Sequence, residues 1–161
     1  QECLYMGNLD AKRDWGHTLD YVRMQWLMLQ QDEPKDFVIA SGFQYSVRDF
    51  IIWSAGELGI QISFHGKGVG EYGKVEDVKG DLAPFVAPGN IILRVDERYF
   101  RPAEVSSLLG DASRARDELG WEPTINPQQM CAEMVAEDLK NAHRRRILKN
   151  SGLAVPESAD L

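Results

Sequence analysis

The sequence Asp36-Phe37-Val38-Ile39-Ala40-Ser41-Gly42 places four consecutive apolar residues between an acidic residue and a serine–glycine pair. An apolar run of this length, without alternation, is typical of a strand that is buried on both faces in a parallel sheet. Such a strand needs neighbouring parallel strands, and the rest of the sequence hardly supplies them. We therefore predict an α/β fold with a parallel sheet, and we expect this chain to be a fragment of a longer protein.

Helical patterns lie on both sides of the apolar run. A helix is predicted from Thr18 to about Gln31 and is stopped by Pro34, because apolar residues that should form its buried side recur at helical spacing: Leu19, Val22, Trp26 and Leu29. Ser46-Val47-Arg48-Asp49 has the pattern of a capping box, and Gly59 should end the helix that it begins. A last helix should begin at Asn126-Pro127.

Two strands and one long loop are predicted in the middle of the chain. Ile60–Phe64 alternates apolar and polar side chains, as a half-buried strand does, and Ile91–Val95 is a second strand. Between them, the glycine-rich stretch His65–Asn90 is predicted to be a loop with at most a short strand at Val75–Val78. A loop of this length within a domain is usually functional or mobile.

Composition indicates an ordinary globular protein. The chain has 161 residues, of which 43% are hydrophobic, and its formal net charge is −7. The negative charge argues against nonspecific binding to nucleic acid or to an anionic membrane, and no apolar run has transmembrane length. The two cysteines, Cys3 and Cys131, are far apart and lie near no histidine cluster, so we predict no metal site and two reduced thiols in a cytoplasmic protein.

Two arginines in distinctive surroundings are the candidates for binding a ligand. Arg13 lies within Gly7–His17, and Arg101 lies within Tyr99–Val105. A guanidinium presents a planar fork of donors that matches phosphate oxygens, so two of them brought together by folding would suit a pyrophosphate. Glu104 accepts hydrogen bonds when it is ionised and would suit ribose hydroxyls or base N–H groups. Taken alone, either arginine fits a surface ion pair or a solvated turn equally well.

The order of the motifs resembles a known family. The segments that carry the resemblance are GNLDAKRDWGHTLDYV, DFVIASG followed by SVRDF, YFRPAEV, LLGDASRARDELGW and EPTI. Together they resemble the C-terminal part of the GDP-mannose 4,6-dehydratase family, a nucleotide-sugar branch of the extended short-chain dehydrogenase/reductase superfamily. The resemblance runs from about Leu4 to about Lys149. The RPAE and GDAS segments are shared with epimerases and decarboxylases, whereas RDWGHTLDYV and the long Phe64–Leu93 insertion point to the GDP-mannose branch.

The resemblance implies a fold, a ligand and a cofactor. Residues 1–42 would end a Rossmann-type dinucleotide-binding domain, residues 43–150 would form most of the small α/β substrate-binding domain, and residues 151–161 would be a flexible tail. The parent enzyme would be a homo-oligomer that uses NADP to convert GDP-mannose to GDP-4-keto-6-deoxy-mannose. Arg13 and Arg101 would neutralise the pyrophosphate, Glu104 would hold the ribose or base, and Leu4 and Met6 would line the guanine.

The catalytic and cofactor-binding motifs of that superfamily are missing from this sequence. Gly66-Lys67-Gly68-Val69-Gly70 is glycine-rich, but no helical pattern follows it, as a dinucleotide-binding turn requires. Each tyrosine that could begin a Tyr-x-x-x-Lys motif lacks the lysine, so we predict no catalytic residue here and no activity from the chain alone. Two alternatives stay open: a related nucleotide-sugar epimerase or decarboxylase, and a noncatalytic fragment that binds a nucleotide sugar.

Overall fold

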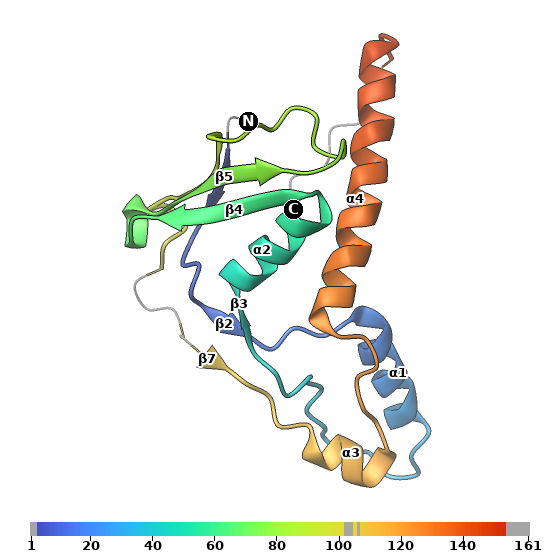
Figure 1. Ribbon diagram of the computed structural model, residues 1–161. Helices are drawn as coiled ribbons and strands as arrows, with labels where there is room; N and C mark the ends of the chain where they lie inside the picture. The colour runs from blue at the N-terminus through green and yellow to red at the C-terminus, as the bar shows by residue number, and fades with distance from the viewer. Residues whose placement is uncertain (1–2, 102–104, 106, 154–161) are drawn as a thin grey trace.

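The computed structural model describes residues 3–101, 105 and 107–153, and it is built around a sheet with a helix on one face (Figure 1). The strands of this sheet lie in the order β1-β6-β5-β4: β1 (Leu4–Met6), β6 (Ile91–Val95), β5 (Tyr72–Val78) and β4 (Ile60–His65). β1 is parallel to β6, and the other two pairings are antiparallel. A mixed α/β fold with a parallel pair is therefore confirmed.

The helix α2 (Val47–Glu57) covers one face of this sheet. Its capping box is formed as predicted, since the Ser46 side chain accepts from the Asp49 backbone N–H while the Asp49 carboxylate accepts from Ser46. Gly59 follows the helix with φ +74°, the left-handed conformation that glycine adopts readily. The core beneath α2 consists of small and medium apolar side chains, among them Ala55, Val75 and Leu93.

The segment between β4 and β6 is more ordered than the sequence predicts. A short 3-10 helix, η1 (Gly68–Gly70), turns the chain into β5, a seven-residue strand that pairs with both β4 and β6. The predicted loop from residue 65 to residue 90 is therefore interrupted by a strand that contains the expected segment Val75–Val78 and begins three residues earlier, at Tyr72. Gly73 and Val75 are buried in β5, whereas Lys74 between them is partly exposed and Glu76 after them is exposed, so side chains do alternate between the two faces. The charged residues of this strand hide the alternation in the sequence.

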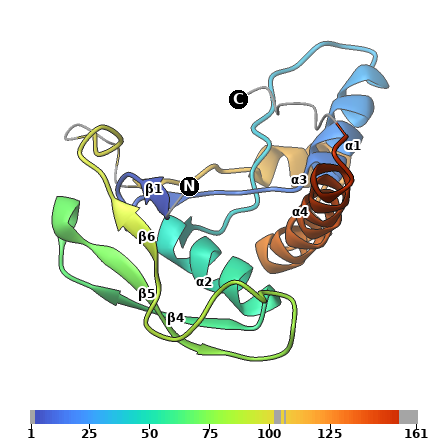
Figure 2. The same cartoon turned by 90° about the horizontal axis from the view of Figure 1, so that it is seen from above.

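A second group of elements lies on the other side of the molecule, as Figure 2 shows. It contains α1 (Thr18–Leu29), α3 (Ser113–Leu119) and the first turns of α4 (Pro127–Asn150), which also packs on α2. Its core is Met24, Ala115 and Trp121. Three two-residue strands join the two groups: β2 (Lys12–Arg13) pairs with β3 (Tyr45–Ser46) and with β7 (Ser107–Leu108).

Two sequence predictions fail in this second group. No strand is assigned over Phe37–Ala40, because no strand of the described residues runs beside it; Val38 is 51% exposed and Ala40 packs on Gly110 instead. The helix α1 begins at Thr18 as predicted and ends at Leu29, two residues before the predicted end, and it buries another side, formed by Asp20, Met24 and their neighbours. The residues expected to face the core are exposed by more than half: Leu19, Val22, Trp26 and Leu29.

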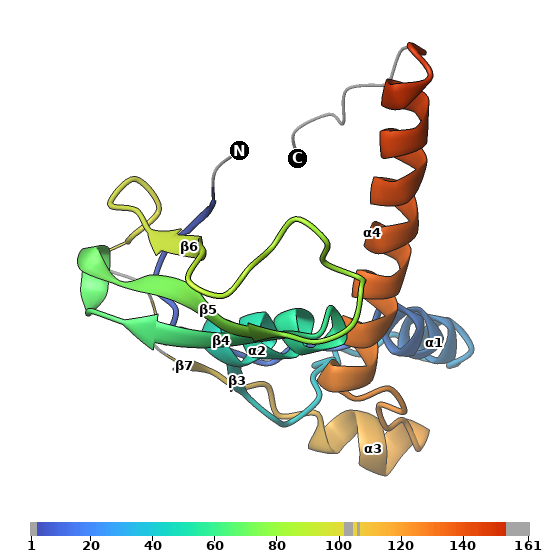
Figure 3. The same cartoon turned by 45° about the horizontal axis from the view of Figure 1, so that its top comes forward.

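The helix α4 is the longest element, and its second half extends beyond the rest of the molecule in Figure 3. The Asn126 cap and Pro127 at the first turn confirm the predicted start of this helix. Among the described residues, no helix combines the length and the hydropathy that crossing a membrane would require.

Candidate functional site

Arg13 lies at the centre of the three short strands. It ends β2, which is paired to β3 on one side and to β7 on the other, and its side chain is partly buried. The Arg13 Nη1 atom donates to the carbonyl oxygen of Lys12 at 2.7 Å and to that of Val105 at 2.9 Å. Both of these acceptors are backbone oxygens, and the contact with Val105 connects Arg13 to the segment that follows Arg101.

A hollow of about 340 Å³ opens beside Arg13. Its walls come from three separate segments of the chain: Arg13, Asp14, Val38, Ile39, Ala40, Leu108, Leu109 and Gly110. The neighbouring carboxylate of Asp14 accepts hydrogen bonds from the backbone N–H and hydroxyl of Ser41 and from the N–H of Gly42, and it thereby fixes the turn after residue 40. The hollow thus combines one cation and one carboxylate with mostly apolar walls.

Arg101 follows β6 and the turn at residues 96–100, and its side chain is exposed. Glu104 lies outside the described residues. The contact from Arg13 to Val105 joins the two arginine motifs in space, although they are far apart in the sequence. The convergence of both guanidinium groups on one pyrophosphate stays a prediction.

Leu4 and Met6 line a different and larger pocket of about 560 Å³. This groove is bounded by β1 and β6, by α2 and by Val135 and Leu139 of α4, and its lining is almost entirely apolar. It shares no lining residue with the hollow beside Arg13. The structure therefore does not bring Leu4 and Met6 into the same pocket as Arg13, and their contact with a base stays a prediction.

Sequence reasoning missed an ionic cluster close to Arg13. Arg48, in the first turn of α2, donates from Nε and Nη2 to Asp10 Oδ1 at 3.1 and 2.8 Å and from Nη1 to Glu71 Oε1 at 2.5 Å. The hydrogen bond to Glu71, with that to Asp10, raises the pKa of Arg48 above its ordinary value. A cation in the first turn of a helix is unfavourable because it opposes the helix dipole. The position of Arg48 in the sequence was therefore a signal that carboxylates elsewhere in the chain compensate its charge.

A serine, a histidine and a glutamate also meet on the sheet. The Ser63 hydroxyl lies 2.8 Å from His65 Nε2 and donates to Glu76 Oε1 at 2.5 Å. In a catalytic triad the acid holds the second ring nitrogen of the histidine, whereas Glu76 contacts the serine and approaches Nε2. This cluster is therefore not arranged as a triad. Within the described ranges, no group of three or more potential ligands could hold a metal ion.

The glycine-rich run Gly66–Gly70 does not fit a dinucleotide. It forms the connection from β4 to β5 through η1, and a strand follows it. A pyrophosphate site of the Rossmann type needs the N-terminus of an α-helix directly after the glycines. We therefore assign no cofactor contact to this run.

Solved structures share this fold. RMD from Pseudomonas aeruginosa, complexed with NADPH, matches 88% of this chain and 37% of its own, with a TM-score of 0.58 and 20% identity. UDP-glucose 4-epimerase from Bifidobacterium longum, in complex with NAD⁺ and UDP, matches 88% of this chain and 36% of its own, with a TM-score of 0.60 and 17% identity. The chain thus has the same fold as a part of each of these two proteins.

Sequence comparison identifies the family of this chain. The family model for GDP-mannose 4,6 dehydratase matches residues 1–134. A GDP-mannose 4,6-dehydratase of Vibrio cholerae is 60% identical over 99% of this chain and 43% of that protein. Those of Yersinia enterocolitica and Homo sapiens are 55% and 43% identical, over 96% and 86% of this chain and 42% and 35% of theirs. The chain belongs to the GDP-mannose 4,6-dehydratase family and spans less than half the length of these relatives.

Proposed function

We propose that this chain forms the GDP-sugar-binding part of a GDP-mannose 4,6-dehydratase, a lyase that converts GDP-mannose to GDP-4-keto-6-deoxy-mannose. Family membership supports the substrate class. The single structural observation that carries the proposal is the contact from Arg13 to the Val105 carbonyl, because it joins the segment of Arg13 to the segment that follows Arg101. On this basis the two guanidinium groups serve one ligand.

Each residue of the site has a distinct role in this proposal. Arg13 and Arg101 neutralise the pyrophosphate, Glu104 accepts from the ribose or the base, and Leu4 and Met6 line the guanine. A hydrogen bond to a charged group contributes about 1.5–3 kcal/mol. The GDP moiety is remote from the reacting carbons of the sugar, so holding it firmly orients the sugar for reaction.

The proposal places catalysis and NADP outside this chain. None of the described residues forms a dinucleotide-binding turn, and no Tyr-x-x-x-Lys motif occurs in the sequence. Residues 1–42 would adjoin the NADP domain, and residues 43–150 would form most of the substrate domain. Both cysteines are free and buried, which is compatible with a cytoplasmic enzyme. Incubation of the isolated chain with GDP-mannose and NADP should yield no keto sugar, whereas a keto product would overturn this division.

Calorimetry with the substitution Arg101→Ala tests the assignment of the site. In the complete gene product, this change should raise the dissociation constant of GDP-mannose at least about tenfold, because one charged contact to the pyrophosphate is lost. Arg13→Ala should have an effect of the same order. Arg144→Ala, on the exposed end of α4, is the matched control and should leave the constant unchanged. An unchanged constant for Arg101→Ala would remove this residue from the site.

A related activity on another nucleotide sugar is the second candidate, because the RPAE and GDAS motifs are shared with epimerases and decarboxylases. Titration with GDP, UDP and dTDP separates the two. The proposal requires that GDP bind at least about tenfold more tightly than UDP, since a guanine and a pyrimidine present different hydrogen-bonding edges to the pocket.

A further inference from the structure

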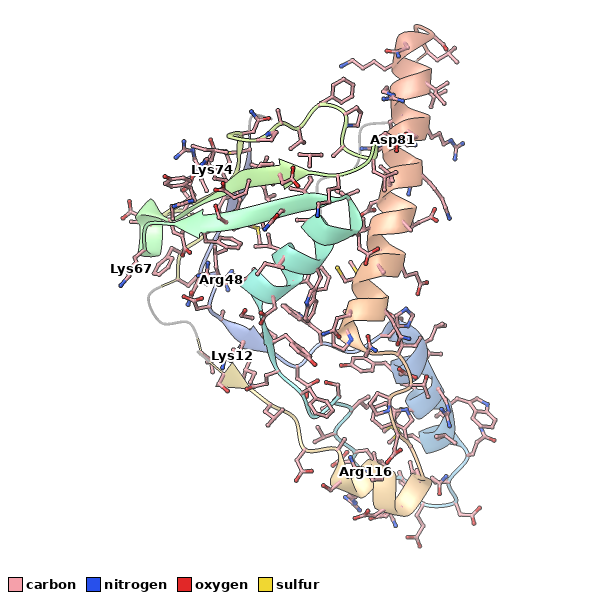
Figure 4. All side chains as sticks on the ribbon, in the orientation of Figure 1. Lys12, Arg48, Lys67, Lys74, Asp81 and Arg116 are labelled. Atoms are coloured by element: carbon pink, nitrogen blue, oxygen red, sulfur yellow. The ribbon has the colours of Figure 1, made fainter. Side chains whose placement is uncertain are left out.

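Arg48 connects the two chain segments that carry the proposed phosphate-binding arginines. We propose that Arg48 is a positioning residue: it fixes the distance between Arg13 and Arg101 by tying their segments to one guanidinium. This inference deepens the proposed function and rests on it. Figure 4 shows Arg48 between β4 and β2.

On one side, Arg48 holds the loop that leads to Arg13. Its Nε and Nη2 atoms share Asp10 Oδ1, three residues before Arg13. Its backbone N–H donates to the Leu9 carbonyl oxygen at 2.9 Å, and the N–H of Val47 donates to that of Ala11 at 3.2 Å. The loop between β1 and β2 is therefore docked on the N-terminus of α2 by both backbone and side-chain contacts.

On the other side, Arg48 holds the corner of the sheet from which Arg101 departs. Its Nη1 atom donates to Glu71, a buried residue just before β5. The carbonyl oxygen of Glu71 accepts a hydrogen bond from the N–H of Val95, the last residue of β6. The next N–H, that of Asp96, donates to the carbonyl oxygen of Met6 at 2.9 Å. The turn at residues 96–100 then leads directly to Arg101. The guanidinium of Arg48 thus reaches the segment of Arg13 directly through Asp10, and it reaches the segment of Arg101 through Glu71 and a second hydrogen bond to Val95.

The surroundings of Arg48 restrict its movement. Its side chain is 23% exposed, and its guanidinium carbon lies 4.6 Å from the centre of the Phe64 ring. Three hydrogen bonds and a ring contact fix a planar guanidinium in one orientation, which a flexible lysine ammonium would not reproduce. Rigid support of this kind is what a site with two phosphate-binding arms, Arg13 and Arg101, needs. A small displacement of one arm weakens contacts that both arms must make with the same pyrophosphate.

Asp10→Ala tests the positioning role without disturbing the buried charge. The Asp10 side chain is 73% exposed, so its loss should leave the melting temperature nearly unchanged. It should weaken the binding of GDP at least about fivefold and the binding of GMP by less than about twofold, because only the diphosphate needs both arms in register. The control is Glu137→Ala, which breaks the exposed Lys140–Glu137 pair on α4 and should change neither affinity.

A pair of variants then separates positioning from stability. Arg48→Met should lower both the stability and the affinity for GDP, because it leaves the Glu71 carboxylate buried without a partner. Adding Glu71→Gln removes that charge and should restore most of the melting temperature. If Arg48 positions the arms, the affinity for GDP stays low in the double variant. Recovery of the affinity together with the stability would overturn the inference.

The outcomes also distinguish this inference from the proposed function. If the unchanged protein binds neither GDP nor GMP in calorimetry, the proposed function fails and this inference fails with it. If Arg13→Ala weakens the binding of GDP but Asp10→Ala does not, the site stands and Arg48 is not a positioning residue. An equal loss of GDP and GMP binding in Asp10→Ala would likewise contradict it, since a disturbed distance between two arms cannot affect a single phosphate equally.

Discussion

Asp20 shows how one residue can hold two distant segments together. It lies on α1 with an exposed fraction of 2%, and its carboxylate accepts from the Thr124 N–H and hydroxyl and from the Ile125 N–H. Its own carbonyl oxygen accepts from the Trp121 indole at 3.0 Å. Every oxygen of Asp20 therefore has a donor, although the residue is almost fully buried.

Replacing Asp20 by asparagine should lower the free energy of unfolding by about 2–3 kcal/mol. The NH₂ group of the asparagine would take the place of one carboxylate oxygen, so donors of Thr124 or Ile125 would lose their acceptor. Urea denaturation measures this loss. Asp117→Asn, on the exposed side of α3, is the matched control and should change the free energy of unfolding by less than about 0.5 kcal/mol. An equal effect of both substitutions would contradict the role of Asp20.

The same carboxylate should make stability depend on pH. Burial opposes the ionisation of Asp20, but the hydrogen bonds from Ile125 and Thr124 outweigh it and hold its pKa below the ordinary value of 3.8. A carboxylate with a lowered pKa contributes stability above the unfolded-state pKa and loses it as the pH falls through the folded-state pKa. Between about pH 5 and pH 2, the stability of the wild type should therefore fall more steeply than that of Asp20→Asn. Parallel curves would exclude this contribution.

At the residue scale, the sequence points to chemistry but not to partners. Arg13 became a candidate binding residue through its motif; the structure shows that it lines a hollow, and its binding role stays a prediction. Asp20 and Arg48 were not identified, because their partners lie far away in the sequence: Thr124 for the first, and Glu71 for the second. An aspartate within a helix has the same local pattern whether it is solvated or buried, so only the tertiary fold reveals its role.

At the scale of elements, local signals predicted most helix ends. The capping box at Ser46, the Asn126 cap with Pro127 and the left-handed Gly59 were all foreseen, since each depends on a few neighbouring residues. The buried side of α1 was not foreseen, because apolar residues recur at helical spacing on two sides of this helix. Periodicity alone does not tell which of the two sides faces the core. The length of β5 was underestimated, because its assignment depends on pairing with β4 and β6.

Two glycines of the α2 region should respond in opposite ways to alanine. Gly59→Ala should lower the free energy of unfolding by about 1–2 kcal/mol or more, because the residue has φ +74° and its new Cβ would overlap the Lys79 carbonyl oxygen. Gly56→Ala should raise it by about 0.5–1 kcal/mol, since Gly56 is helical and has open space around it. Thermal or urea unfolding compares them, and a loss in both variants would refute this account.

At the scale of the whole molecule, the exposed side of α1 is a large apolar surface. Leu19, Val22, Trp26 and Leu29 are exposed by between 53% and 81%, and Val38 is 51% exposed. Contiguous apolar surface of this kind promotes association. The fold class could be foreseen because many motifs agreed. The absence of a strand at residues 37–40 could not, since it depends on which other strands lie beside this segment.

The isolated chain should therefore self-associate, and Trp26→Ser combined with Leu29→Ser should weaken that association. Sedimentation equilibrium measures the change in apparent mass. Phe85→Ser is the matched control, because Phe85 is 81% exposed, as Leu29 is, but lies in the loop between β5 and β6, far from α1 in sequence. A monomeric wild-type chain, or an equal effect of Phe85→Ser, would contradict the role of α1.

The parallel pairing of β1 with β6 has a consequence for synthesis on the ribosome. The strand β1 ends at Met6 and its partner begins at Ile91, so most of the intervening chain must emerge before the pair can form. At about 5–20 residues per second, the nascent β1 waits several seconds for β6. The β4–β5 hairpin closes a short loop and can form in the meantime. During that interval the backbone of β1 lacks the hydrogen bonds that it makes with β6 in the structure.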